Sequence, residues 1–407
     1  MRTVTAPRIQ RISNLLLIGL FLMGIWLPLA DWAFHLDQSP PLPRNFRPAK
    51  LPRPEFDLKR IAEYPEKFER YYNEHLGFRK TLIRWNNLFH VQVLGVSPLP
   101  TAIVGEKGWL YLGRGYEYEY YRSARPFTRE ELQRWQQVLE ERRDWLADRG
   151  IPYLFVIAPN KSTIYPELMP AGINRIRQES RLDQFLAYMQ ANSDVAILDV
   201  REPLREAKIQ QQVYSRMDSH WNNYGAFIAY QQLMNRLAVW FPQLHAQPLS
   251  VFALRSTLTA EKYRGHLGLV RMFGLEGHIA DEYLELIPQS PRLAHIERLS
   301  HNIVVSEVRD PTLPRTVMIH DSFGHELPQY LSEHFQRVVY SLGSQQFPHA
   351  LIAEEHPDIV IQEMAERHLL KKKPTNPLTV AGFRANPRKL LGEKIPVNDS
   401  APETEQR

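Results

Sequence analysis

The sequence predicts an α/β domain in three layers, built on a parallel sheet and preceded by an N-terminal transmembrane helix. Three observations indicate this class. From residue 150 onward, short apolar runs alternate with amphipathic helical segments, as in a parallel sheet covered by helices on both faces. The 407 residues are 43% hydrophobic and 23% charged, which is enough apolar material for a large folded domain. The first eleven residues carry Arg2, Arg8 and Arg11, and a long uncharged run follows them.

That apolar run, Leu15–Ala30, predicts the transmembrane helix. Sixteen helical residues rise about 24 Å, slightly short of a hydrocarbon core of about 30 Å, and Ile12 on one side and residues 32–34 on the other can extend the helix. The arginines on its N-terminal side place that end in the cytoplasm and the rest of the chain outside. No convincing small-residue cleavage site follows, which favours an uncleaved, single-pass signal anchor over residues 1–35 in the inner membrane. A buried core helix is the alternative. The proline-rich residues 36–55 predict a semi-rigid linker, and residues 371–407 a basic, polar and flexible tail.

The globular domain is expected over residues 56–370. Between Phe56 and Leu88, apolar residues at helical spacing predict two short helices. Residues 103–111 contain two strand-like pieces joined by a glycine-containing turn, which predicts a β-hairpin. A capping box at Thr128–Glu131 predicts an amphipathic helix that ends near Gly150.

Beyond that helix the pattern alternates between strand and helix. Between about 243 and 310 the alternation is interrupted, which predicts an insertion of mixed structure. The predicted strands are 153–158, 195–200, 316–319, 338–341 and 359–361, and the predicted helices are 182–190, 224–240 and 326–335, the last with Pro328 in its first turn.

The composition excludes several kinds of site. The chain has no cysteine, so disulfides, thiolate zinc sites, iron–sulfur clusters and cysteine nucleophiles are excluded. Its 15 histidines include no H-E-x-x-H spacing, and we expect neither a metal nor a cofactor. The net charge of +5 is too small to predict a nucleic-acid partner.

One candidate for chemistry is Ser322, which lies where the strand 316–319 gives way to a predicted helix. Ligands of α/β sheets bind beyond the carboxyl ends of the strands. A helix that begins there would offer unpaired N–H groups and its positive dipole end to an oxyanion, and Gly324 would let the backbone approach a bound group. A serine hydroxyl is a weak nucleophile, so it needs a base within about 2.6–3.2 Å.

The segment 216–226 can provide that base. His220 is the candidate to take the serine proton, and Asp218 can hold the imidazole in one tautomer. In an extended segment residues i and i+2 point to the same side, so this pairing is geometrically reasonable. Asn222 or Asn223 would cap the helix that follows and fix the loop.

Other interpretations stay open. The D-S-F-G sequence can be a helix cap, and the Asp-x-His pair can bind a metal, although no third ligand is evident nearby. His320 and His325 flank the serine as competing bases. They rank below His220, because His320 would point away at the strand end and His325 would lie inside the helix. Trp221 and Tyr224 are better explained as packing residues than as sugar platforms.

Two motifs carry a family resemblance. D-S-H-W-N at 218–222, about a hundred residues before D-S-F-G at 321–324, resembles the alginate O-acetyltransferase family of periplasmic proteins, whose domain is related to SGNH hydrolases. The order of the motifs is circularly permuted relative to ordinary SGNH enzymes. The resemblance covers about residues 56–370. Less specific similarity to the family occurs at 104–110, 159–166 and 363–367.

The resemblance implies an SGNH-like fold in which Ser322 is the nucleophile, His220 the base and Asp218 the orienting acid. It implies an acetyl-serine whose acetyl group passes to a polysaccharide hydroxyl, with a membrane-bound acyltransferase as donor partner. Two departures from the family's usual residues can alter the oxyanion hole or the choice of substrate. His320 stands where many relatives have glycine, and His266 stands where an acid is often found.

The sequence thus predicts an extracytoplasmic O-acetyltransferase that acts on an exopolysaccharide, alginate-like or other. Two alternatives remain. The same three side chains would serve a carbohydrate acetyl-esterase, because water can resolve the acyl-enzyme as a sugar does. The domain can also be catalytically idle and serve as a polysaccharide-binding or scaffold subunit of an export complex.

Overall fold

A computed structural model describes residues 6–40, 49–53, 57–115, 117–258, 268–343, 347–371 and 373–375. By their contacts the residues fall into two compact units. One comprises 1–99 with 270–279, and the other 100–269 with 280–407. Residues 56–99, which the sequence groups with the globular domain, therefore belong with the N-terminal helix. Half of the predicted linker and nearly all of the predicted tail lie outside the described residues.

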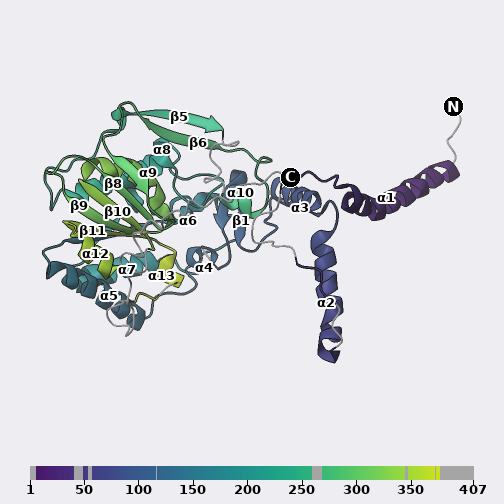
Figure 1. Cartoon of the computed structure of the whole chain (residues 1–407), viewed down its shortest axis with the longest axis horizontal. Helices are drawn as coiled ribbons and strands as arrows, with labels where there is room; N and C mark the ends of the chain where they lie inside the picture. Colours follow the sequence, from purple (N-terminus) through teal and green to yellow (C-terminus); the bar gives the residue numbers. More distant parts are fainter. Residues whose placement is uncertain are drawn as a thin grey trace, which may run out of the picture. The chain divides into compact units, whose positions relative to one another are not determined.

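The first unit is helical (Figure 1). Its first helix, α1, is the one helix in the described part of the chain that is long and apolar enough to cross a membrane, and its window Gln10–Phe34 is not buried. Two helices follow on either side of Gly77, as the sequence predicts. The helices are α1 (Ala6–Phe34), α2 (Leu58–His75) and α3 (Arg79–Leu88), which continues as a π-helical turn Phe89–Val93. α10 (Gly268–Met272) crosses from the second unit into the first.

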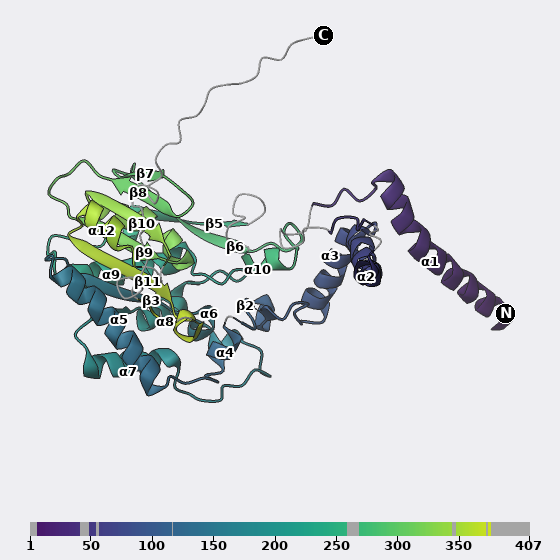
Figure 2. The same cartoon turned by 60° about the horizontal axis from the view of Figure 1, so that its bottom comes forward.

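The second unit is built on a seven-stranded sheet in the order β4-β3-β11-β9-β10-β8-β7 (Figure 2). The first five strands are parallel, and β8 and β7 add an antiparallel edge. The strands of this sheet are β3 (Tyr153–Ala158), β4 (Ala196–Asp199), β7 (His295–Arg298), β8 (Ile303–Glu307), β9 (Arg315–His320), β10 (Arg337–Leu342) and β11 (Ile359–Ala365). Two separate antiparallel pairs are β1 (Ala102–Val104) with β2 (Leu110–Leu112), the predicted hairpin, and β5 (Phe252–Leu258) with β6 (Glu282–Pro288).

Helices connect these strands. The predicted capping box is present at the start of α5, where Thr128 accepts a hydrogen bond from the backbone of Glu131 and its own backbone donates to the Glu131 side chain. The α-helices of the unit are α4 (Tyr118–Tyr121), α5 (Arg129–Ala147), α6 (Lys161–Ile164), α7 (Arg181–Asn192), α8 (Arg201–Gln210), α9 (Asn223–Leu237), α11 (Pro328–Leu331), α12 (His349–Glu355) and α13 (His368–Lys371).

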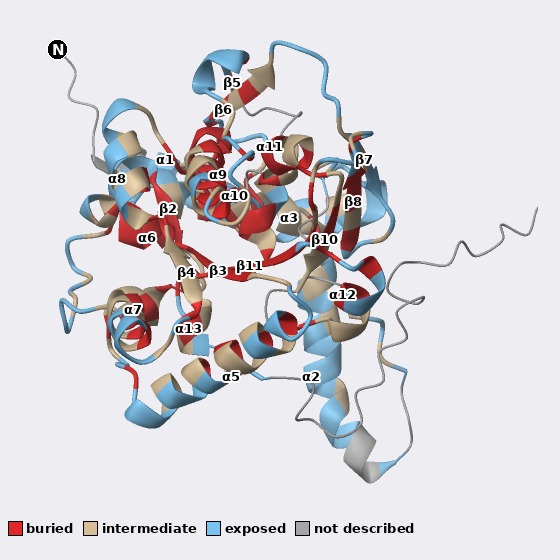
Figure 3. Ribbon diagram, turned by 90° about the vertical axis from the view of Figure 1, so that its left-hand side faces the viewer, coloured by how far each residue is buried: buried red, intermediate tan, exposed pale blue. Residues whose placement is uncertain are grey.

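The helices cover both faces of the sheet, which gives the three predicted layers (Figure 3). On one face Val156 and Met318 belong to a cluster with Phe227 of α9. On the other face Phe155 and Val317 belong to a cluster with residues of α5 and α7. Successive side chains of a strand point to opposite faces, so the central strands are buried along their length. The predicted α/β class is confirmed.

Two details of the prediction are wrong. The sheet is mixed rather than wholly parallel. Its antiparallel strands β7 and β8 come from the segment 243–310, which the sequence predicts to be an insertion. β7 is the edge strand and most of its residues are exposed, so it lacks the continuous apolar run of a central strand. β8 lies between β10 and β7 and contains only a short apolar run at 303–305. The predicted helix 326–335 is instead a 3-10 turn Ser322–Glu326, the four-residue α11 and a second 3-10 turn Ser332–His334. Pro328 has no N–H to donate and breaks the helical ladder at this point.

Candidate active site

Ser322 lies immediately beyond the carboxyl end of β9, between the ends of β10 and β11. The preceding residue, Asp321, holds the serine there. One of its carboxylate oxygens accepts the N–H of Phe323 at 3.0 Å, and the other accepts the N–H of Ala365 at 2.8 Å. Asp321 therefore caps the turn that carries the serine and ties it to the end of β11. The helix-cap interpretation of D-S-F-G applies to Asp321, while the Ser322 hydroxyl has another partner.

That partner is His220. The Nε2 atom of His220 lies 2.7 Å from the Ser322 hydroxyl oxygen. On the other side of the ring, Nδ1 lies 2.5 Å from a carboxylate oxygen of Asp218, which also accepts the His220 backbone N–H at 3.0 Å. The structure thus brings all three predicted site residues together, although Ser322 is a hundred residues from the others in sequence. A hydroxyl, an imidazole and a carboxylate hydrogen-bonded in this order can generate a serine nucleophile.

Asp218 carries the negative charge of this chain of hydrogen bonds. Its second carboxylate oxygen accepts the N–H of Gly268 at 2.7 Å. Burial alone would raise the pKa of Asp218, but the imidazole of His220 and these backbone donors outweigh it and hold the pKa below its usual range. Asp218 is therefore ionised at neutral pH. An ionised partner keeps the proton on Nδ1 of His220 and leaves Nε2 free to accept the serine proton.

Lys161 fixes the backbone of the loop that carries Asp218. Its ammonium group is fully buried and donates to three carbonyl oxygens, those of Leu110 at 2.7 Å, Arg216 at 2.8 Å and Asp218 at 2.9 Å. Burial lowers the pKa of Lys161 to about 7. The sequence analysis assigned this lysine no role. Lys161 is the first residue of α6, three residues after the end of β3.

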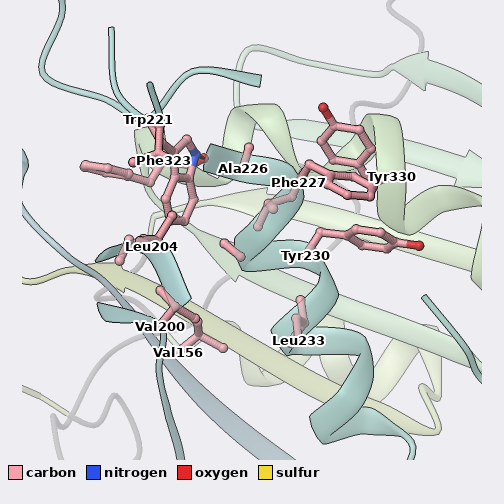
Figure 4. Close-up of a cluster of buried hydrophobic side chains, with 14 of the residues drawn as sticks. Val156, Val200, Leu204, Trp221, Ala226, Phe227, Tyr230, Leu233, Phe323 and Tyr330 are labelled. Atoms are coloured by element: carbon pink, nitrogen blue, oxygen red, sulfur yellow. Dashed lines mark hydrogen bonds between the residues drawn. The ribbon is translucent and has the colours of Figure 1, made fainter. Parts of the chain in front are cut away.

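The aromatic residues beside His220 form part of the core. The indole N–H of Trp221 donates to the carbonyl oxygen of Phe323 at 3.0 Å, and the two rings meet edge to face (Figure 4). The Phe323 ring also packs against the His220 ring, with 4.8 Å between centroids. Trp221 and Tyr224 are both buried, so they pack as predicted and do not present sugar-binding surfaces. The predicted cap is Asn222, whose side chain accepts the N–H of Gly225 at 2.9 Å.

Neither competing histidine contacts the serine hydroxyl through a hydrogen bond in the described structure. His320 is buried, and its Nδ1 atom lies 2.7 Å from the carbonyl oxygen of Asp321. Burial lowers the pKa of His320 to about 4. His325 lies 5.5 Å from the His320 ring between centroids and is on the surface. Burial of part of its ring and the proximity of His220 lower its pKa as well.

One expectation about the turn after Ser322 is wrong. The turn has five residues in a 3-10 conformation, so it supplies no long helix dipole. Gly324 is needed for packing against the protein itself, because a Cβ atom there would lie 2.5 Å from the Cβ of His320. Within the described residues, the Phe323 and Gly324 amides bond to Asp321, whereas the Ser322 amide has no acceptor and is the donor that remains for an oxyanion.

A polar cluster missed by the sequence analysis lies behind the serine. A carboxylate oxygen of Glu363 accepts the backbone N–H of Asp321 at 3.0 Å. Burial and the neighbouring Asp321 charge raise the pKa of Glu363 well above its usual value. Burial would also raise the pKa of Asp321, but His368 and Arg367 more than offset it and lower that pKa. The cluster therefore joins the carboxyl ends of β9 and β11 with two carboxyl groups whose pKa values are shifted in opposite directions.

The second carboxyl group near His220 is that of Glu326. It accepts hydrogen bonds from the side chains of Asn223 at 2.5 Å and Gln329 at 2.9 Å. Burial raises the pKa of Glu326 to about 7, and the charge of Asp218 adds to this while His220 opposes it. The described residues contain no group of three His, Cys, Asp or Glu side chains that could hold a metal. His266 lies outside the described residues.

Residues 102–366 match a family model described as the SGNH hydrolase-like domain of the acetyltransferase AlgX. The probable alginate O-acetylase AlgJ of Pseudomonas syringae pv. tomato is 30% identical over 168 residues, and that of Azotobacter vinelandii is 25% identical over 170 residues. Each match covers 41% of this chain. The chain spans about two fifths of these relatives, 40% of the first and 41% of the second.

Two solved structures are similar to this chain. The O-acetyltransferase domain of Pseudomonas putida AlgJ aligns over 68% of this chain and 94% of its own, with a TM-score of 0.47 and 19% identity. Bacillus cereus PatB1 aligns over 65% of this chain and 95% of its own, with a TM-score of 0.48 and 13% identity.

Proposed function

This chain belongs to the family of SGNH hydrolase-like domains of the AlgX acetyltransferase type, and from this membership we propose that it is an O-acetyltransferase with a serine nucleophile. Ser322 is the nucleophile, His220 the general base and Asp218 the residue that orients the base. The observation that carries the proposal is the unbroken line of hydrogen bonds from Asp218 through His220 to the Ser322 hydroxyl.

The geometry supports a two-step transfer. In the first step Ser322 Oγ attacks the carbonyl carbon of a donor acetyl group while His220 Nε2 takes its proton. The donor's leaving group departs with that proton, so an acetyl-serine and a neutral imidazole remain. In the second step an acceptor hydroxyl attacks the acetyl carbonyl and gives its proton to His220, and Ser322 regains that proton as it leaves. The free Ser322 amide supports the oxyanion in both steps.

We propose an exopolysaccharide, alginate-like or other, as the acceptor and a membrane-bound acyltransferase as the donor partner. The name of the AlgJ relatives, probable alginate O-acetylase, supports the first. The apolar helix α1, long enough to cross a membrane, supports a location beside a membrane protein. The surplus of 50 basic over 45 acidic residues favours an acidic polymer only weakly.

The location proposed is the inner membrane, with residues 1–35 as a single-pass anchor and the domain outside the cytoplasm. α1 supports the anchor by its length and composition, and Arg2, Arg8 and Arg11 support the orientation. In this division residues 36–55 are a linker and residues 371–407 a tail.

The test is mass spectrometry of the protein after incubation with a chromogenic acetyl ester. We expect one acetyl group on Ser322 in the parent chain, and neither that group nor acetyl release in Ser322→Ala. Unchanged turnover by Ser322→Ala would exclude the serine mechanism. Added polysaccharide should gain acetyl groups if the chain is a transferase, whereas acetate release alone would identify an esterase. Polymer binding without any turnover in the parent would identify a scaffold subunit.

A further inference from the structure

Helix α3 has its polar and apolar sides reversed relative to a helix of a soluble protein. Arg84 and Asn87 face the protein and are only 5% and 8% exposed. Leu82, Trp85 and Phe89 face outward and are 55%, 70% and 50% exposed. An ordinary surface helix buries its apolar stripe and exposes its polar one. We therefore expect the exposed side of α3 to contact a partner other than water.

Hydrogen bonds fix this orientation. The Arg84 guanidinium donates through Nε to the carbonyl oxygen of Gly274 at 3.0 Å, and the Asn87 amide donates to that of Phe273 at 2.8 Å. Rotating the helix to bury its apolar side would break both bonds and leave buried groups without partners, which is costly. The reversed amphipathicity is thus a stable property of this unit.

The exposed residues form one continuous stripe. Leu82, Trp85, Phe89 and Val93 follow one another at spacings of three or four residues, which places them on one side of the helix. We call these four residues the α3 apolar face. A contiguous exposed apolar surface of this kind marks a site of interaction.

The start of α3 is tied to the end of α1. The backbone N–H of Phe78 donates to the carboxylate of Asp31 at 2.8 Å, and the hydroxyl of Thr81 donates to that of Asp37 at 2.9 Å. Asp31 is the first charged residue after Arg11, and nineteen helical residues lie between the two. The twenty residue steps from Arg11 to Asp31 rise about 30 Å, the thickness of a hydrocarbon core. If α1 spans the membrane, Asp31 and the start of α3 lie at the boundary between hydrocarbon and headgroups.

We propose that the α3 apolar face lies in the interfacial layer of the outer leaflet of the bilayer, so that α3 is a second, peripheral membrane contact beside the anchor. This inference rests on the proposed membrane anchor. Tryptophan and phenylalanine are typical of interfacial helices, and Trp85 is the most exposed member of the face. A lipid surface fits as the partner of the α3 apolar face, because this face begins at the depth at which α1 leaves the hydrocarbon core of the bilayer.

A cavity of about 370 Å³ at the same end of α1 supports a lipid environment. Leu29 and Trp32 of α1 and Phe68 and Tyr72 of α2 contribute to its mainly apolar lining. Its aromatic side chains and its position beside the last turns of α1 suit contact with the upper part of an acyl chain.

The test uses the absence of cysteine, which allows single spin labels without other changes. Full-length variants Leu82→Cys, Trp85→Cys and Phe89→Cys would be labelled in vesicles of phosphatidylethanolamine and phosphatidylglycerol. Collision rates with oxygen, which concentrates in lipid, and with a water-soluble nickel chelate would be measured by electron paramagnetic resonance. Gln133→Cys on the exposed side of α5 is the aqueous control, and Phe21→Cys within α1 reports the anchor.

We expect the ratio of oxygen to nickel collisions to be several-fold higher at the three α3 positions than at Gln133→Cys. Ratios equal to that of Gln133→Cys, with Phe21→Cys still protected from nickel, would overturn the inference and leave the anchor intact. The α3 apolar face would then be a binding surface for another protein, which these vesicles do not contain. Nickel access at Phe21→Cys would instead show that the anchor proposal itself fails.

Discussion

At the scale of single residues, two buried charges determine where His220 points. Asp218 accepts the ring and backbone N–H groups of His220, and Lys161 holds the carbonyl oxygen of Asp218 and that of Arg216. Both charged groups are buried, which is costly unless their hydrogen bonds are complete. Their partners compensate that cost only in this loop conformation, so the 2.7 Å contact between His220 and Ser322 follows from it.

Asp218→Asn tests the electrostatic part of this arrangement. We expect kcat for a chromogenic acetyl ester to fall by about three to four orders of magnitude, because a neutral amide neither fixes the imidazole tautomer nor stabilises the imidazolium. Asp310→Asn, in an exposed loop, is the matched control and should retain full turnover. A loss smaller than tenfold in Asp218→Asn would mean that this carboxylate does not orient the base.

Glu326 predicts a pH dependence of stability. Its pKa is raised from 4.5 to about 7 in the folded chain, so the folded state binds the proton more tightly than the unfolded state. The stability it contributes is complete below about pH 4.5 and is lost as pH rises through 7. The free energy of unfolding of the parent, relative to Glu326→Gln, should therefore fall by about 2.5 kcal/mol between pH 5 and pH 8.

Denaturant unfolding at the two pH values measures this difference, with Glu206→Gln on the exposed side of α8 as the control. A difference that stays constant or grows with pH would contradict the raised pKa.

At the scale of elements, the start of α9 positions the loop that carries His220. Asn222 caps the helix, and its own backbone N–H donates to the carbonyl oxygen of Val213 at 3.1 Å. Gly225 in the first turn lies against the same carbonyl, since a Cβ atom there would approach it to 2.0 Å. The first turn of α9 and residues 213–222 therefore pack backbone to backbone, which adds to the side-chain contacts of Lys161 and Asp218 in fixing the loop.

Gly225→Ala tests this packing. The added methyl group must push the Val213 carbonyl away, and overpacking of this kind costs about 1–3 kcal/mol. We expect a loss of stability of that size, together with a fall in kcat at temperatures where the variant is fully folded, because the loop that carries His220 must move. Gly172→Ala is the control, since a Cβ there meets nothing within 4 Å. Equal activity of the two variants would show that the loop adapts without moving His220.

At the scale of the whole molecule, two chemically different parts are joined in one chain. α1 is apolar around its whole circumference and unburied, while the second unit buries an α/β core between two helical layers. A helix that is apolar on all sides is stable in a bilayer and costly in water. The proposed membrane attachment would therefore belong to the N-terminal segment and not to the unit that carries the active site.

The double variant Leu20→Arg, Met23→Arg tests this division. Each arginine at the centre of a membrane helix costs about 2.5–3.5 kcal/mol on insertion scales, which together abolish stable insertion. We expect the variant to leave the membrane fraction, whereas Leu20→Val, Met23→Leu should remain. Extraction with alkaline carbonate and immunoblotting would measure both. Retention of the double-arginine variant in the membrane fraction would show that other segments suffice for attachment.

The alternating pattern beyond residue 150 identified the central strands, because strands buried on both faces need continuous apolar runs. It did not identify β7 and β8 as part of the sheet, since β7 is a mostly exposed edge strand and β8 carries only a short apolar run. It also extended one helix through Pro328, where the missing N–H divides the segment into short turns.

The sequence by itself predicted the fold class, the apolar N-terminal helix and Ser322, His220 and Asp218 as the candidate site residues, from residue type, local spacing and the resemblance to a family. Only the tertiary structure decided that these three side chains meet, that Lys161 and Asp321 hold them in place, and that α3 turns its apolar side outward. Those features depend on backbone groups and on residues distant in the chain, and local sequence patterns carry no information about which distant carbonyl a buried donor will reach.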